Sequence, residues 1–432
     1  MEIKDNRISH ISHHTSQYGI AFDIGTTTIV GSLIDLNTAK EIDADSLPNP
    51  QSRFGKDILS RVNCIIEDTS QLRVLQQDAV RACRNIIRSI IGQAPLLLTE
   101  DIKIVVAVGN SVMEHLLLGI SPVSLAKIPY RPAFKDAKKL SAKDVGFAEL
   151  GYAELYVFPL IGGFIGGDTV AVILAANIHK AKDISLAIDI GTNSEIVLCS
   201  DGQLYAASAA AGPAFEGGSI KYGMIADTGA IQGVKIENGR LILDVIGNTN
   251  PEGICGSGII DIIAQLLNAG VIDTTGRIKN RNEIEGNLAN KIRESNEGNA
   301  FALYKDAKKE VVITQKDLRG LQLAKAAIQA GIKLLFKKAQ ISADKIDKVF
   351  IAGAFGSNIK KESLIRIGVL QKEWIDKIIF VGDAALDGAK LALCSEEKRK
   401  EAEDIAIRTK YLSLSGSAHF QKEFMKGMAF PG

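Results

Sequence analysis

The sequence predicts an α/β fold made of two similar halves that hold one ligand between them. Residues 22–28 (FDIGTTT) and residues 188–194 (IDIGTNS) each end one apolar run and open another. This pattern predicts a strand, a tight Gly-Thr turn and a second strand, with one carboxylate at the end of the first strand. Residues 350–357 (FIAGAFGS) add a buried strand that runs into a glycine turn. Two such hairpins, one at the start of each half, favour a duplicated fold.

The first half of the chain predicts strands that alternate with helices. Continuous apolar runs predict strands, and apolar residues spaced by three and four predict helices. The expected elements are strands at 19–22, 29–34 and 41–46, helical segments within 56–91 with a break at 68–70, a strand at 102–108, a helix from there to 118, an irregular segment at 122–143, a strand at 155–159 and a helix at 168–179.

The second half repeats this order with additions. The turn sequence Asp201-Gly202 is typical of a hairpin, and so is Asn238-Gly239. The expected elements are three hairpin strands within 186–205, a hairpin at 231–246, a helix at 256–267, a polar surface insertion at 276–310, a helix at 315–339, strands at 349–352 and 378–381, and a helix at 384–393.

The length of 432 residues is too great for one ordinary hydrophobic core and predicts two domains of unequal size. The expected division is a polar N-terminal extension at 1–18, a first domain at 19–184 and a second domain at 185–432. The second domain would carry the polar insertion at 276–310.

Composition excludes several classes of partner. The 51 basic and 50 acidic residues give a formal net charge of +1, so no overall field attracts nucleic acid or acidic membranes. The polar N-terminus lacks the apolar core of a signal peptide, and no apolar stretch reaches the length of a membrane span. We therefore expect a cytoplasmic protein with no nucleic-acid or membrane partner.

The five cysteines are scattered, with no C-x-x-C pair. This number and spacing predict reduced thiols, and they argue against a disulfide framework and against a self-contained four-cysteine cluster.

The repeated hairpins predict a clamp for a nucleoside triphosphate. Asp23 and Asp189 would suit a hydrated Mg²⁺ ion, although an aspartate often simply caps a turn; the duplication favours the metal role. Backbone N–H groups, hydroxyls and a side-chain amide beside the glycines suit phosphate oxygens. The expected phosphate ligands are Gly25, Thr26, Thr27, Gly191, Thr192 and Asn193.

Two further carboxylates have open interpretations. Asp168 follows a glycine run and precedes an apolar helix, so it is either a helix N-cap or the catalytic group that orients an attacking water. Glu216 follows Gly212-Pro213 and either faces the ligand in a similar way or is an acidic residue at a helix start.

These motifs resemble the superfamily of acetate kinase, sugar kinase, heat-shock 70 and actin ATPases. The resemblance implies two actin-like (ribonuclease H-like) α/β domains with an interdomain nucleotide cleft that binds ATP and Mg²⁺. Residues 23–28 and 189–194 would be the two phosphate loops, and residues 162–168 and 382–390 the two interdomain connections. The adenosine motif would consist of Gly353, Ala354, Phe355, Gly356 and Ser357.

A narrower resemblance covers residues 19–430. The segments 49–57 (NPQSRFGKD), 109–115 (GNSVMEH), 211–218 (AGPAFEGG) and 253–258 (GICGSG) are similar to those of reductive activators of corrinoid proteins. The resemblance implies an ATPase that returns cob(II)alamin to cob(I)alamin on a partner corrinoid protein.

The cysteine pattern departs from this family, whose members usually carry an iron–sulfur domain. No iron–sulfur cluster is expected in this chain. The electron would come from a separate donor such as a ferredoxin, or from a domain that the sequence does not include. The resemblance also favours a homodimer.

Two other functions on the same fold stay open at this point. A small-molecule kinase would need an acceptor pocket and a base near the terminal phosphate. An actin-like assembly protein would show ATP-dependent sedimentation and little turnover when dispersed.

Three other side chains have a structural interpretation beside a functional one. His115 is expected to be a satisfied histidine rather than a ligand, and Cys255 is expected to pack. Ser208 and the three alanines after it predict a small-residue loop, which would let the cofactor of the partner approach closely.

Overall fold

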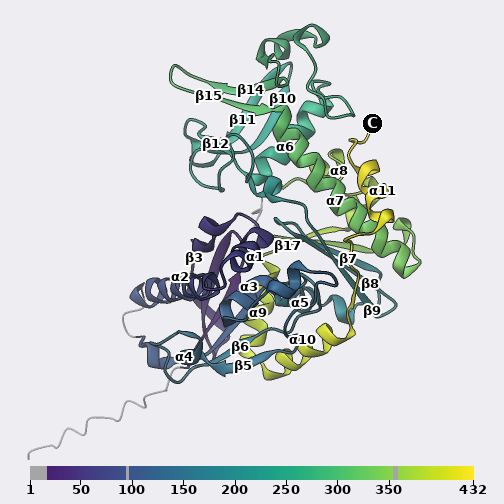
Figure 1. The fold of residues 1–432 in the computed structure, drawn as a ribbon. Helices are drawn as coiled ribbons and strands as arrows, with labels where there is room; N and C mark the ends of the chain where they lie inside the picture. The colour runs from purple at the N-terminus through teal and green to yellow at the C-terminus, as the bar shows by residue number, and fades with distance from the viewer. Residues whose placement is uncertain (1–16, 94–96, 354–358) are drawn as a thin grey trace, which may run out of the picture.

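The computed structural model describes residues 17–93, 97–353 and 359–432 (Figure 1). The first half forms a mixed six-stranded sheet in the order β3-β2-β1-β4-β6-β5. Strand β1 pairs antiparallel with β2 and parallel with β4. The strands are β1 (Tyr18–Ile24), β2 (Thr28–Asp35), β3 (Lys40–Pro48), β4 (Ile102–Gly109), β5 (Lys138–Ser141) and β6 (Glu154–Val157). The helices of this half are α1 (Ile58–Glu67), α2 (Gln71–Gln93), α3 (Ser111–Leu118), α4 (Ala142–Val145) and α5 (Gly167–Ala175).

The second half forms a sheet of the same size in the order β17-β16-β7-β8-β9-β18. Strand β7 pairs antiparallel with β8 and parallel with β16, as β1 pairs with β2 and β4. The strands are β7 (Ser185–Asp189), β8 (Ser194–Ser200), β9 (Gln203–Ala209), β16 (Lys348–Ala352), β17 (Ile378–Gly382) and β18 (Lys410–Tyr411). The two halves therefore place equivalent hairpins next to equivalent parallel strands.

A further part of the second half lies at the top of the view in Figure 1. It contains two three-stranded sheets, β11-β10-β12 and β13-β14-β15. The strands are β10 (Ala230–Glu237), β11 (Arg240–Val245), β12 (Gly253–Ile254), β13 (Ile292–Arg293), β14 (Ala300–Lys305) and β15 (Glu310–Thr314). The remaining helices of the chain are α6 (Gly256–Asn268), α7 (Gln315–Ala339), α8 (Lys361–Arg366), α9 (Ala384–Cys394), α10 (Glu396–Arg408) and α11 (Ala418–Gly427).

Local signals fix the ends of the helices. Helix α3 begins where the Asn110 side chain accepts hydrogen bonds from two backbone N–H groups, and it ends at Gly119 in the left-handed conformation. Helix α7 begins with a capping box of Thr314 and Asp317 and ends at Ala339, with Gln340 as its C-cap. The predicted helix at 168–179 ends earlier, at Ala175, and a short 3₁₀ turn follows it.

Residues 276–310 do more than cover the surface. They contain β13 and β14, and the Phe301 and Leu303 side chains of β14 are buried in the core of the second half. Side chains alternate between the two faces of a strand, so Phe301 and Leu303 lie on one face of β14 and let a charge-rich segment contribute to a core.

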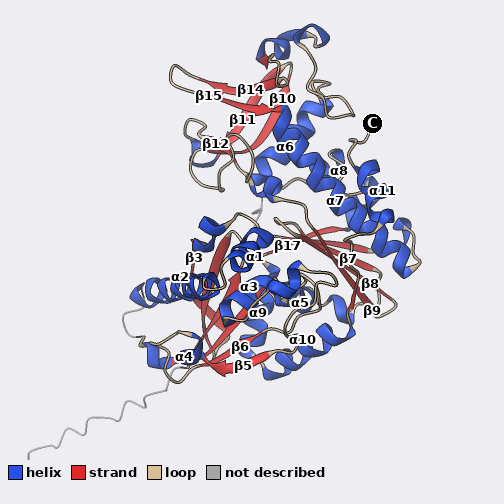
Figure 2. Cartoon of the chain, in the orientation of Figure 1, coloured by secondary structure: helices blue, strands red, loops and turns tan. Residues whose placement is uncertain are grey.

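A buried layer connects the two six-stranded sheets. Figure 2 shows helices α5, α9 and α10 in this region. One hydrophobic cluster contains Ala21 of β1, Ala187 of β7, Val170 of α5 and Ala389 of α9. Helix α9 follows β17 of the second sheet in sequence, yet it packs on β1 and β4 of the first. Helix α9 therefore connects the two halves through its packing.

Within residues 17–93, 97–353 and 359–432, no helix combines the length and the apolar character that crossing a bilayer requires.

The contact between α5 and α9 gives a test of this layer. A Cβ atom at Gly388 of α9 would lie 2.2 Å from the backbone oxygen of Ala171 in α5. We expect Gly388→Ala to lower the free energy of unfolding by about 1–3 kcal/mol, because backbone cannot yield as a flexible side chain can. Urea denaturation measures this loss.

Gly320→Ala is the matched control, since Gly320 also lies in a helix. Its Cβ atom would meet only Ala214, at 3.8 Å. This variant should be neutral or stabilised by up to about 1 kcal/mol, because alanine favours a helix more than glycine does. Equal effects of the two substitutions would contradict the close contact.

Candidate functional site

The two hairpin aspartates occupy equivalent positions. Asp23 lies in β1 beside parallel β4, and Asp189 ends β7 beside parallel β16. Side chains alternate along a strand, so Asp23 faces the same way as Ala21, and Asp189 the same way as Ala187. Both alanines belong to the buried layer between the sheets. The two carboxylates therefore point from the two sheets toward one region.

Two helices of this layer begin near the same carboxylates. Asp168 lies in the first turn of α5, and its Oδ1 atom accepts a hydrogen bond of 2.6 Å from the backbone N–H of Thr169. Asp383 is the N-cap of α9 and accepts one of 3.1 Å from the N–H of Leu386. A helix N-terminus carries partial positive charge, which favours an acidic side chain there.

Burial raises the pKa values of the enclosed carboxylates, and neighbouring carboxylates add to the shifts of Asp23 and Asp189. Burial, followed by the charges of Asp383, Asp168 and Asp189, holds the pKa of Asp23 well above its usual range. Burial, followed by the charges of Asp168 and Asp383, raises the pKa of Asp189 to about 7. Burial raises the pKa of Asp168 to about 6, although hydrogen bonds from Thr169 oppose the shift. The three side chains predicted as catalytic or metal-binding thus lie within one electrostatic field.

Glu114 of α3 binds the backbone at the start of α5. Its side chain is fully buried on α3, and its Oε1 atom accepts a hydrogen bond of 3.1 Å from the N–H of Gly167. Its Oε2 atom is buried without a hydrogen-bond partner among the described residues. The backbones approach closely here, because a Cβ atom at Gly166 would lie 2.1 Å from the oxygen of Gly109. Burial and the charge of Asp168 raise the pKa of Glu114.

Glu195 adds another buried carboxyl on β8. Burial, then the charges of Asp168 and Asp189, raises its pKa, and the Ser208 hydroxyl donates a hydrogen bond of 3.0 Å to its Oε1 atom. Ser208 lies in strand β9 and is half-buried. The loop that the sequence predicted at Ser208 is therefore wrong, because this small-residue segment pairs with β8 as far as Ala209.

A buried arginine holds the first hairpin. Arg61 of α1 is fully buried, and its guanidinium donates to the backbone oxygen of Thr26 at 2.5 Å and to Gln51 Oε1 at 3.0 Å. Asn49 Nδ2 donates to the backbone oxygen of Gly25 at 2.9 Å. Burial lowers the pKa of Arg61 to about 10, so the group stays charged near neutral pH. The segment 49–57 thus supports the turn of the first hairpin.

Glu216 connects the two hairpins. Its Oε2 atom accepts a hydrogen bond of 2.9 Å from the Thr27 hydroxyl. Its Oε1 atom accepts from the backbone N–H of Thr192 at 2.5 Å, and both carboxylate oxygens lie 3.1 Å from the Thr192 hydroxyl. Of the two interpretations that the sequence left open, the structure supports a Glu216 that faces the hairpins.

The glycine turn after β16 is described only at its first residue. The N–H of Gly353 donates a hydrogen bond of 3.1 Å to the oxygen of Gly382, so Gly353 lies beside the start of α9. The predicted adenosine residues Ala354, Phe355, Gly356 and Ser357 lie outside the described residues.

His115 and Cys255 pack within the protein. The Nδ1 atom of buried His115 lies 2.6 Å from the oxygen of Ser111, and its Nε2 atom accepts from the N–H of Ala133 at 2.9 Å. The Cys255 thiol is buried, 3.4 Å from both the backbone oxygen of Ile231 and the Ser257 hydroxyl. These contacts agree with the structural interpretation of both residues.

The enclosed carboxylates are candidates to hold a divalent cation. Within the described parts of the chain, no three His, Cys, Asp or Glu side chains are close enough together to hold a metal ion. Mg²⁺ commonly keeps several of its waters and binds through one or two carboxylates. Enclosed acidic groups with raised pKa values are the environment that such a cation would neutralise.

Sequence patterns had not marked several of these side chains as functional. Asp383 had a signal, since it follows a strand and a glycine as Asp168 follows its glycine run. Glu114 and Arg61 sit in helices as polar residues on faces that are otherwise apolar, which is a weak signal for one chain alone. Glu195 could be recognised only from the fold, because its role depends on its distance from Asp168 and Asp189.

The substitution Asp189→Asn tests how much stability the protein loses when the buried Asp189 carboxylate is ionised. The folded-state pKa of about 7 exceeds the usual value of 3.8. The folded protein therefore binds this proton more tightly than the unfolded chain does. The resulting contribution to the free energy of unfolding is fully present below about pH 4 and is lost as the pH rises through 7. At pH 8 without divalent ions, the variant should melt at least about 2 °C higher than the unmodified protein.

Adding Mg²⁺ with nucleotide at pH 8 should raise the melting temperature of the unmodified protein more than that of Asp189→Asn. Asp376→Asn is the control, because Asp376 is exposed and should behave like the unmodified protein. Identical melting temperatures of Asp189→Asn and the control, with and without Mg²⁺, would contradict the assignment.

Family models match both halves of the chain. The model described as the RACo middle region matches residues 18–181, and the model described as the C-terminal domain of RACo, the ASKHA domain, matches residues 183–432.

Curated proteins and solved structures show the same relationship. The chain is 36% identical over 419 residues to the corrinoid activation enzyme RamQ of Eubacterium limosum, which covers 96% of this chain and 70% of that protein. It is 26% identical over 458 residues to the [Co(II) methylated amine-specific corrinoid protein] reductase of Methanosarcina barkeri, covering 96% and 77%. The structure of a reductive activator for corrinoid, iron-sulfur protein matches with a TM-score of 0.89 and 34% identity over 97% of this chain and 67% of that one.

These matches confirm the resemblance to corrinoid-protein activators and the actin-like α/β fold. They also agree with the arrangement of two hairpins beside parallel strands in the two six-stranded sheets. The chain belongs to the RACo family and carries its actin-like ASKHA domain.

Proposed function

We propose that this protein is an ATPase that couples ATP binding and hydrolysis to the reduction of a corrinoid protein from cob(II)alamin to cob(I)alamin. The observation that carries the proposal is the convergence of Asp23, Asp168 and Asp189, from both halves, on one electrostatic site beside the two Gly-Thr hairpins. The relatives named above support the corrinoid part of the proposal.

The hairpins would bind the phosphates. Their backbone N–H groups and hydroxyls are the donors that phosphate oxygens accept. Asp23 and Asp189 would hold Mg²⁺ through water, and the ion would neutralise charge on the phosphate oxygens. The proposed phosphate ligands are Gly25, Thr26, Thr27, Gly191, Thr192 and Asn193.

Asp168 would orient the attacking water. A carboxyl with a pKa of about 6 is largely ionised at neutral pH and still accepts a proton readily. Its hydrogen bond from Thr169 and the contact of Glu114 with Gly167 hold it in place at the start of α5. Water activation at this position is typical of phosphoryl transfer, in which the protein mainly positions the reactants.

The adenosine would lie at the turn that begins with Gly353. Backbone N–H groups beside small residues allow a close approach of a flat ligand. We assign Ala354, Phe355, Gly356 and Ser357 to the same role from the sequence motif alone.

Nucleotide turnover would drive the electron transfer through domain closure. Moving one electron uphill costs about 1.4 kcal/mol for each ~59 mV, and a conformational change tied to ATP could supply this. Because the halves share the layer of α5 and α9, closure on a nucleotide would alter the surface offered to the partner. We propose a separate donor such as a ferredoxin, or an iron–sulfur centre outside residues 1–432, as the electron source.

The partner surface would include the region of Ser208, and the active species would be a cytoplasmic protein that forms a homodimer. If the Ser208→Ala variant leaves corrinoid reduction unchanged, Ser208 does not belong to this surface.

An anaerobic assay tests the proposal. The protein, ATP, Mg²⁺ and a low-potential reductant are mixed with a cob(II)alamin-loaded corrinoid protein, and the absorbance of cob(I)alamin is followed. We expect ATP to increase the yield over reductant alone. Asp168→Asn should bind nucleotide yet lose at least about 100-fold in hydrolysis and in ATP-dependent reduction, because the attacking water loses its base.

Glu237→Gln is the control for the assay, because Glu237 is exposed at the end of β10. No ATP-dependent gain in cob(I)alamin would contradict the corrinoid function. Substrate-stimulated release of ADP with a small molecule would instead indicate a kinase, and ATP-dependent sedimentation would indicate an assembly protein.

A further inference from the structure

We propose that Glu216 is a built-in competitor for the terminal phosphate of the nucleotide, so that it weakens the binding of a triphosphate relative to that of a diphosphate. This inference rests on the proposed function. It goes further because it assigns a role in specificity to a side chain outside the metal-binding, water-orienting and phosphate-binding groups.

The contacts of Glu216 are those expected of a bound anion. Its carboxylate accepts hydrogen bonds from the Thr27 hydroxyl of the first hairpin and from both the N–H and the hydroxyl of Thr192 in the second. A phosphate oxygen would use the same three donors. One carboxylate thus accepts hydrogen bonds from both hairpins and links them.

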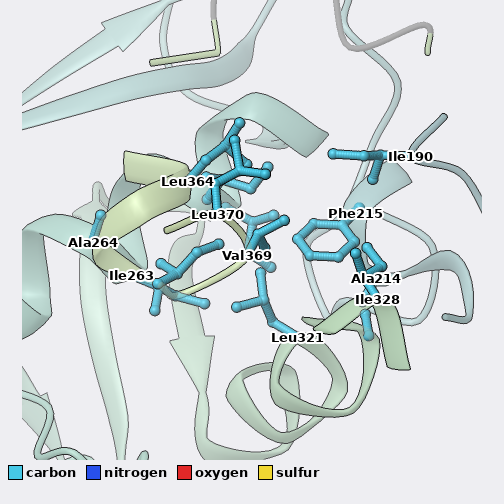
Figure 3. Close-up of a cluster of buried hydrophobic side chains, with 14 of the residues drawn as sticks. Ile190, Ala214, Phe215, Ile263, Ala264, Leu321, Ile328, Leu364, Val369 and Leu370 are labelled. Atoms are coloured by element: carbon cyan, nitrogen blue, oxygen red, sulfur yellow. The ribbon is translucent and has the colours of Figure 1, made fainter. Parts of the chain in front are cut away.

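The backbone beneath Glu216 is firmly held. Phe215 is fully buried, and Figure 3 shows its ring packed among Ala214, Ile328 and Val369, with Ile190 of the second hairpin nearby. A phosphate that enters the hairpins would therefore displace the half-buried Glu216 carboxylate by rotation of its side chain. The segment that carries it would stay anchored in the core.

The competition has an electrostatic component. Glu216 adds negative charge next to Asp189, whose pKa its charge helps to raise. Bringing phosphate into the same place would add repulsion unless the carboxylate leaves. A phosphate that takes this place must therefore replace the charge-assisted hydrogen bonds of Glu216, and only a group that reaches both hairpins can form all of them.

The terminal phosphate of a triphosphate is the group placed to reach both hairpins. A diphosphate lacks this group and would leave the Glu216 bonds to Thr27 and Thr192 intact. Removing the carboxylate should therefore favour the triphosphate selectively.

Titration calorimetry of the full chain tests the inference, with Mg²⁺ and either ADP or the non-hydrolysable imido analogue of ATP. Glu216→Gln should bind the triphosphate analogue about tenfold more tightly than the unmodified protein does, because a neutral amide competes less well for the donors. Its affinity for ADP should change by less than about threefold. Glu216→Ala should show the same selectivity, and Glu237→Gln should leave both affinities unchanged.

Unchanged or weaker binding of the triphosphate analogue by both Glu216 variants would overturn the inference, as would an equal gain for ADP. Loss of hydrolysis in Glu216→Gln without tighter binding would overturn it as well and would place Glu216 among the catalytic groups. If the unmodified protein and Glu237→Gln bound neither nucleotide, the proposed ATPase function itself would fail, and this inference with it.

Discussion

Enclosed negative charge is the constraint on which this structure depends. Asp23, Asp168, Asp189 and Asp383 come from two sheets and two helix starts, yet burial and the charges of Asp168 and Asp383 raise the pKa values of both Asp23 and Asp189. A fold that gathers carboxylates in this way loses stability when they ionise without a partner. Helix N-termini offset part of that cost. A cation with a bound nucleotide would offset more, and this gives ligand binding a direct effect on the relation between the halves.

The architecture follows from that constraint. Side chains alternate along β1 and β7, so each strand buries one face in its own half and turns an aspartate toward the layer between the sheets. Helix α9 returns from the second sheet to pack on the first, which holds the two sources of carboxylate together. Arg61 behind the first hairpin and Phe215 behind the second fix the backbone on either side.

Much of this arrangement could be predicted from the sequence. The hairpins have a period of two and a turn residue at a fixed offset, so β1, β2, β7 and β8 were expected where they lie. The contributions of Glu114 and Glu195 could not be predicted in the same way, because they depend on distances between elements far apart in the sequence. The Ser208 segment was expected as a loop because its small residues give no strand signal, whereas pairing with β8 determines its conformation.

Both halves would contribute to a single metal–nucleotide site. A double-mutant cycle measures this most directly, with Asp23→Asn, Asp189→Asn and the double variant, and with the affinity for Mg²⁺ and the imido analogue of ATP as the readout. Two carboxylates that hold one hydrated ion act together, so the loss in the double variant should fall short of the sum of the single losses by at least about 1 kcal/mol. Losses that add within about 0.3 kcal/mol would show two independent groups and would contradict the account.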